Sequence, residues 1–230
     1  MFSTHRQSPG ASSADVLCET FQYLSKSTWS LLRRGRKQGV QINEETITNL
    51  LMLRLQETAS AHLRVQSFSK KEESVTGADR EWWLGWVGFR LQAKVINFKS
   101  DSFEHLYYIP PKSIIPQYQR LITDALRGRP QRIPLYCLYI QSEQSIGARR
   151  TSRAGCSLLS PMIVRGMART TKRRLVELYE HTTPWHELVC PPPPPKPRRG
   201  LPPKAPEGDH PNPKRKSPRG HHSPQQQAIL

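Results

Sequence analysis

The sequence predicts an α/β protein with one folded domain, and three observations support this fold class. Segments of helical periodicity alternate with short runs of β-branched and aromatic residues, the pattern of helices packed on a sheet. The chain has 230 residues, enough for one core with appendages but short for two full-sized domains. The composition changes abruptly at residue 191, which marks a domain boundary.

Helical patterns dominate the first sixty residues. Asp15 is followed by apolar residues at helical spacing, which predicts a helix that ends at Gly35 or Gly39. Asn43 is the predicted N-cap of a second helix over 44–57, where the apolar residues form one stripe.

Strand patterns follow. The segment 62–68 alternates polar and apolar residues, as a half-buried strand does, and 70–76 is predicted to be a loop. The runs 81–86 and 88–96 are aromatic and β-branched and are separated by a short glycine-flanked connection, which predicts a β-hairpin.

The rest of the domain returns to mixed patterns. We expect a helix over 114–126, then an apolar strand over 133–140 that is covered on both faces of the sheet. Two further helices are predicted around 162–167 and 171–181. The predicted order is therefore helix, helix, three strands, helix, strand and terminal helices.

The last 40 residues form a proline-rich basic tail. They hold 13 of the 21 prolines, eight Lys or Arg and two acids. So few apolar side chains cannot offset the entropy of ordering, and we expect residues 191–230 to be disordered. We expect the same of residues 1–14, which are rich in small and polar residues, so that 15–190 form the domain. Composition alone leaves open whether the tail contacts nucleic acid, recruits a partner protein through polyproline or is inert.

Charge and hydropathy narrow the function classes. The formal net charge of +17 makes a polyanion such as DNA the natural partner. No apolar stretch approaches the roughly 20 residues of a bilayer span, so no contact with a membrane is expected. No secretory signal is visible, which predicts a cytoplasmic protein. The four cysteines include no CxxC pair and are predicted to be reduced, packed thiols.

One set of polar residues suggests chemistry. Asp79 stands at the entrance to one strand of the predicted hairpin, and Gln92 and Lys94 lie on one face of the next. With the hairpin in register, a carboxylate, an amide oxygen and an ammonium converge. Phosphodiester cleavage needs oxygen ligands for a hard divalent cation and a lysine beside the attacking water. Glu45, on the preceding helix, adds a second carboxylate.

This arrangement resembles the PD-(D/E)XK nuclease superfamily, in the variant with a QxK element at Gln92-Ala93-Lys94, over roughly residues 43–141. The resemblance implies a restriction-endonuclease-like core with a mixed sheet flanked by helices, and Mg²⁺ or Mn²⁺ as cofactor. It implies that Glu45, Asp79, Gln92 and the carbonyl of Ala93 surround the metal and that Lys94 is catalytic. Gln117 matches a glutamine that members often carry on the following helix. The proline of the motif is replaced by Ala78.

The wider pattern is similar to a bacterial family of uncharacterised nuclease-like proteins, and a role in host defence is expected on that analogy alone. Glu81, two residues beyond Asp79, is a reserve ligand or a solvated hairpin acid. Three tryptophans, Trp82, Trp83 and Trp86, either stack on bases or pack in the core. Three arginines in a later loop are a candidate phosphate-contact patch, namely Arg149, Arg150 and Arg153.

Two functions of different classes follow. The first is a metal-dependent endonuclease that hydrolyses DNA, where a homodimer would suit double-strand cleavage because one site cuts one strand at a time. The second is a catalytically inactive nucleic-acid-binding module on the same fold, because Gln92 is neutral and the motif proline is missing.

Overall fold

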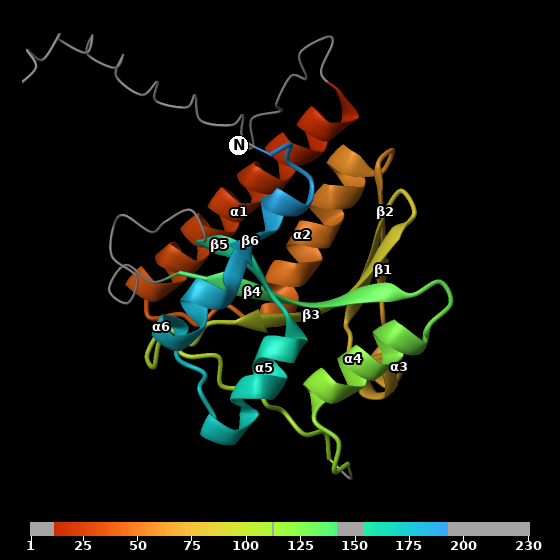
Figure 1. The fold of residues 1–230 in the computed structure, drawn as a ribbon. Coiled ribbons are helices and arrows are strands. Elements are labelled where there is room, and N and C mark those ends of the chain that lie inside the picture. The colour runs from red at the N-terminus through yellow and green to blue at the C-terminus, as the bar shows by residue number, and fades with distance from the viewer. Residues whose placement is uncertain (1–11, 112, 142–153, 193–230) are drawn as a thin grey trace, which may run out of the picture. The chain divides into compact units, whose positions relative to one another are not determined.

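The computed structural model describes residues 12–111, 113–141 and 154–192 (Figure 1). The chain divides into two units, 1–192 and 193–230, and the description below concerns the first. The predictions for the tail beyond Pro192 and for Arg149, Arg150 and Arg153 lie outside the described residues. In the part of the chain that is described, no helix is both long enough and apolar enough to cross a bilayer.

Six strands form one mixed sheet in the order β1-β2-β3-β4-β5-β6, which is also their order along the chain. The strands are β1 Leu63–Ser67, β2 Arg80–Leu84, β3 Val87–Val95, β4 Arg132–Ile140, β5 Gly155–Leu159 and β6 Thr182–Pro184. Neighbouring strands are antiparallel except for β3 and β4, which are parallel. The parallel pair requires a crossover, which the chain makes through α4.

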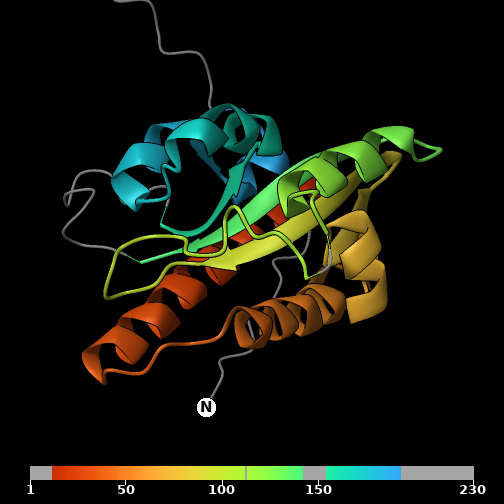
Figure 2. The same ribbon diagram turned by 90° about the horizontal axis from the view of Figure 1, so that it is seen from below.

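Helices cover both faces of the sheet (Figures 1 and 2). The α-helices are α1 Ser13–Lys37, α2 Glu44–Ala59, α3 Lys70–Thr76, α4 Gln117–Arg127, α5 Pro161–Met167 and α6 Leu175–Leu178. Three short 3₁₀ turns, η2 Ala168–Thr170, η3 Tyr179–His181 and η4 Trp185–Leu188, complete the fold. The long helices α1 and α2 pack on one face, and α4 and α5 pack on the other. The predicted α/β class is therefore confirmed.

Alternation along the central strands builds a core on each face. Leu91 and Ala93 of β3 join the core beneath α1 and α2. Tyr136 and Leu138 of β4 join the core beneath α4 and α5. The prediction that the strand over 133–140 is covered on both faces is confirmed for its second half, which is buried throughout. The sheet centre can therefore hold polar side chains of β3 away from bulk water.

The segment 70–76 is a helix, and its prediction as a loop was wrong. Ser69 caps α3 in a capping box with Glu72, and Gly77 ends the helix with a left-handed φ of 73°. No residue of α3 is buried, so the helix has no apolar stripe from which periodicity could predict it. Strands β5 and β6 were also missed, and the helix predicted over 171–181 is reduced to the four residues of α6 and the η3 turn.

Two of the four cysteines form a disulfide. Cys18 of α1 is bonded to Cys190, with 172 residues of sequence separation and 4.6 Å between the Cα atoms. The prediction of four reduced thiols is therefore corrected for this pair and confirmed for Cys137 and Cys156, which are free and buried. Disulfides persist in oxidising compartments, so the expected cytoplasmic location stays a prediction. The N-terminal boundary also moves, because Ser12 caps α1 and the helix begins at Ser13.

Candidate functional site

The β2–β3 hairpin brings Asp79 to the middle of β3. The pairing of Arg80 with Leu91 aligns the residue before β2 with Gln92. The Asp79 amide donates to the carbonyl of Leu91 at 2.9 Å, and its Oδ2 accepts from the amide of Ala93 at 3.1 Å. Gly77 is required at the preceding turn because a Cβ there would lie 2.5 Å from the carbonyl oxygen of Gln117. The convergence of Asp79 with the QxK element therefore follows from strand register.

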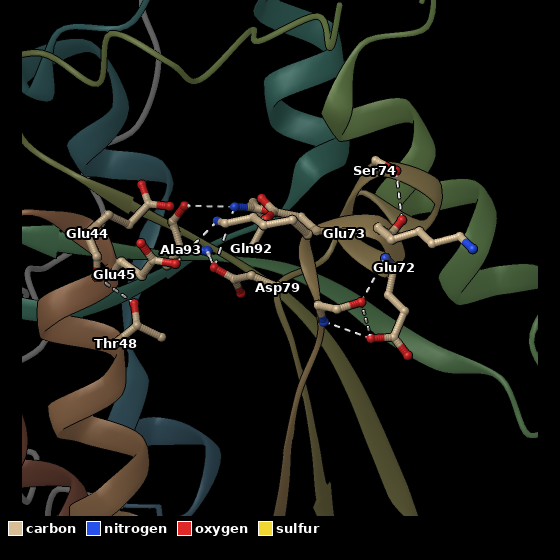
Figure 3. A network of polar contacts seen from close by, with 12 residues as sticks. Glu44, Glu45, Thr48, Glu72, Glu73, Ser74, Asp79, Gln92 and Ala93 are labelled. Atoms are coloured by element: carbon tan, nitrogen blue, oxygen red, sulfur yellow. Dashed lines mark hydrogen bonds and ion pairs between the residues drawn. The ribbon is translucent and has the colours of Figure 1, made fainter.

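A chain of amide contacts leads away from Asp79 (Figure 3). The Nε2 of Gln92 lies 3.5 Å from Asp79 Oδ2 and 3.3 Å from the carbonyl of Ala93. The Oε1 of Gln92 accepts from Gln117 Nε2 at 2.9 Å, and that nitrogen also lies 3.3 Å from Glu73 Oε1. Gln92 Oε1 keeps a second lone pair as an amide oxygen, so its role as a metal ligand stays a prediction. Gln117 itself does reach the site, as the resemblance implied.

The acid of α2 that faces Lys94 is Glu44. Its Oε1 lies 3.7 Å from Lys94 Nζ, whereas Glu45 is 67% exposed and lies 3.5 Å from the ammonium of Lys70. The role of Glu45 as the helical acid stays a prediction, because both residues line the same pocket. The sequence could have predicted that Glu44 faces inward. Glu44 is four residues before buried Thr48 and therefore lies on the same face of the helix.

Burial perturbs two carboxylates of the site. Desolvation raises the pKa of Glu44 to about 7, and the negative charges of Asp79 and Glu73 add to the increase while Lys94 opposes it. Desolvation also raises the pKa of Asp79 to about 6, against the opposing effects of Arg80, the Ala93 amide and Lys94. The Oδ1 of Asp79 is buried and has no hydrogen-bond partner. Burial therefore disfavours the charged forms of both carboxylates.

A pocket of about 540 Å³ opens onto part of the site, and buried Asp79 and Gln92 are not among its lining residues. Glu44, Glu73, Lys94 and Gln117 line it. His105 and Tyr108, from the segment between β3 and α4, form another part of its wall. Glu73 was missed by sequence reasoning because it lies on the helix α3 that was itself predicted to be a loop.

The oxygen atoms of the site suit a hard divalent cation. Asp79 Oδ1 is unpartnered, and the carboxylates of Asp79 and Glu44 are both desolvated. Within 12–111, 113–141 and 154–192, no group of three or more His, Cys, Asp or Glu side chains is arranged to hold a metal ion. Mg²⁺ commonly binds through one or two carboxylates and keeps several waters, so a two-carboxylate site with the Ala93 carbonyl nearby still fits it.

The other candidate residues lie elsewhere. Glu81, the reserve ligand, is buried and forms ion pairs with Arg90 and Arg132. Trp82 packs against Phe21 and Trp185 in the core. Trp83 lies between two arginines, and Trp86 is 97% exposed at the turn of the hairpin.

A family described as a family of unknown function, DUF6615, matches residues 17–215 of the chain. The chain belongs to this family. The match includes all the residues of the site, from Glu44 to Gln117. No curated protein matches the chain at a significant level. Membership in DUF6615 therefore names no substrate, and the function has to be argued from the chemistry of the site.

Proposed function

We propose that the protein is a Mg²⁺- or Mn²⁺-dependent endonuclease that hydrolyses phosphodiester bonds of DNA. The observation that carries the proposal is the approach of Glu44 to Lys94 in the lining of one pocket, with buried Asp79 close enough for its charge to raise the pKa of Glu44. The order α2, β1, β2, β3, α4, β4, with α3 inserted, supports it as well, because the nuclease resemblance implies that order. The net charge of +17 suits a polyanionic substrate.

Each residue has a distinct task in this proposal. A bound cation would polarise the scissile phosphate and lower the pKa of a water molecule. Asp79 Oδ1 and Glu44 would hold that cation, while the Ala93 amide and Gln92 orient Asp79 through its other oxygen. Gln117 holds Gln92 in place. Lys94 Nζ would donate to the attacking water and stabilise the charge that develops on the phosphate.

The alternative is an inactive nucleic-acid-binding module on the same fold, and one observation favours it. Gln92 is neutral and its oxygen already accepts from Gln117, so the position where a charged ligand is expected supplies no charge. Such a module would bind DNA equally well with and without a divalent cation. A host-defence role and a homodimer stay predictions under either function.

Cleavage of supercoiled plasmid in Mg²⁺ and in EDTA tests the proposal. Wild-type protein should nick the plasmid only in Mg²⁺, and Lys94→Ala should reduce the rate at least about 100-fold because it removes the ammonium beside the reacting water. Lys71→Ala removes the same charge from the exposed face of α3 and should cut normally. Equal cutting by Lys94→Ala would make the proposal wrong. Absence of cutting, with DNA binding unchanged by EDTA, would favour the inactive module.

A further inference from the structure

The groups proposed to react are recessed in the fold. Gln92 is 0% exposed, Lys94 is 6% exposed and Asp79 is 9% exposed. They lie at the centre of a sheet that helices cover on both faces. Lys94 lines the pocket, so a phosphate must enter the pocket to reach its ammonium.

The volume of the pocket indicates how much of a nucleic acid can enter it. Its volume of about 540 Å³ is that of a site for a small organic molecule, for which the usual range is roughly 300–1,000 Å³. One nucleotide fits this volume. Enzymes that act in such pockets take the nucleotide out of the helix or use a single strand.

An aromatic pair stands in the wall of the pocket. The rings of His105 and Tyr108 meet edge to face, with 6.4 Å between their centroids and 89° between their planes. Tyr108 is 41% exposed, although it is a large aromatic residue. Unpaired bases are bound by stacking on such side chains. Asn43, which also lines the pocket and makes no side-chain cap bond to α2, offers an amide to a base edge.

The aromatic pair is tied directly to the buried polar chain. The amide of Gln117 donates to the carbonyl of Tyr108 at 2.9 Å, and the amide of Tyr108 lies 3.3 Å from the carbonyl of His105. The side chain of the same Gln117 donates to Gln92. Gln117 thus connects the backbone of Tyr108 with the side chain of Gln92. A base that stacks on Tyr108 is held at a fixed position relative to Gln92.

We propose that this pocket takes an unpaired nucleotide whose base stacks on Tyr108, with the perpendicular ring of His105 beside it, so that the substrate is single-stranded or locally unpaired DNA. This inference rests on the proposed nuclease function and specifies its substrate class. It assigns to Tyr108 the role of a residue that determines specificity. The stacking contacts involve the base and not the scissile phosphate. They therefore form whether or not the strand is cut.

Binding in EDTA tests the inference without any cleavage. The full chain is titrated into a fluorescein-labelled single strand and into its duplex, and the ratio of the two dissociation constants is measured. Wild-type protein should prefer the single strand. Tyr108→Ala should weaken single-strand binding about tenfold, the effect of roughly 1.4 kcal/mol of lost stacking, and leave duplex binding unchanged. Tyr108→Phe keeps the ring and should retain the preference.

Trp86→Ala is the matched control, because it removes the most exposed aromatic side chain among the described residues from the hairpin turn, outside the pocket. It should leave the ratio unchanged. His105→Ala provides a second variant of the aromatic pair, should Tyr108→Ala fail to fold. A wild-type protein that binds duplex as tightly as single strand, or an equal loss in Trp86→Ala, would overturn the inference. If Mg²⁺-dependent, Lys94-dependent cleavage persists in either case, the nuclease proposal stands while this inference fails.

Discussion

Asp79 and Glu81 are two buried carboxylates on the same face of one hairpin, and their surroundings differ. Glu81 Oε2 lies 3.2 Å from Arg90 Nη1 and 2.9 Å from Arg132 Nε, and its other oxygen accepts from Trp83. Arg90 Nε in turn lies 3.0 Å from an oxygen of Asp124. Asp79 has one oxygen bound to the Ala93 amide and one without a partner. Glu81 is thus neutralised within the fold, and Asp79 is not.

This difference separates a structural carboxylate from a candidate functional one. Burying a charge is costly unless it is paired, so an unpaired buried carboxylate has to be retained for another reason. Asp79 and Glu81 are two residues apart, so their side chains lie on the same face of the hairpin. This spacing was the reason why the sequence indicated Glu81 as a reserve metal ligand. The partners supplied by the neighbouring strands decide between the two roles.

Asp79→Asn should have the largest effect of the changes that test this comparison. Cleavage should fall about 1,000-fold, because a neutral amide cannot hold a divalent cation as a carboxylate does. The melting temperature should stay the same or rise, because ionised Asp79 is destabilising above its raised pKa of about 6. Plasmid assays and thermal melts measure the two effects. Normal cleavage by this variant would place the metal site elsewhere.

Glu81→Gln should show the opposite pattern. Removing the charge leaves Arg132 buried without its carboxylate, and the free energy of unfolding should fall by about 3 kcal/mol. Cleavage per folded molecule should be unchanged, because Glu81 lies outside the pocket that Lys94 lines. Urea denaturation followed by cleavage assays at low temperature would measure both. A loss of cleavage without a loss of stability would contradict this prediction and would indicate that Glu81 is a metal ligand after all.

Glu44→Gln and Glu45→Gln form a matched pair on one helix. We expect cleavage to fall about tenfold or more in Glu44→Gln, since this acid faces Lys94 and its pKa is raised to about 7. Glu45→Gln should change it little, because Glu45 is mostly exposed. The same plasmid assay at several Mg²⁺ concentrations compares them. The reverse order of effects would restore Glu45 as the helical ligand.

The pH dependence of stability in EDTA tests the same comparison without any cleavage assay. The pKa values of Glu44 and Asp79 are raised in the folded state, so this state binds more protons than the unfolded one between about pH 4 and pH 7. The free energy of unfolding should therefore fall as pH rises through this range, by about 1.4 kcal/mol for each unit by which burial raises a pKa. Asp79→Asn should remove its share of the slope. Stability that increased with pH here would contradict the unpaired state of both acids.

The sequence predicted the parts of the fold that repeat a pattern along one element. The stripe of α2 and the aromatic hairpin of β2 and β3 were predicted within a few residues, and the register of that hairpin placed Asp79 beside Gln92. Helix α3 was missed because it buries nothing, and β6 because three residues are too few to show alternation. Glu73 was not predicted as a site residue because it lies on α3. The disulfide could not be predicted, since only the fold brings residues separated by 172 positions together.

The bond between Cys18 and Cys190 closes nearly the whole folded unit into a covalent ring. A pulling force applied to the chain beyond Cys190 therefore passes directly into α1 at Cys18. With the bond intact, such a force does not separate β6 from its single neighbour β5. The disulfide carries the force, so the chain between Cys18 and Cys190 is not stretched. After reduction the same force acts on β6 first, and the sheet opens strand by strand from that edge.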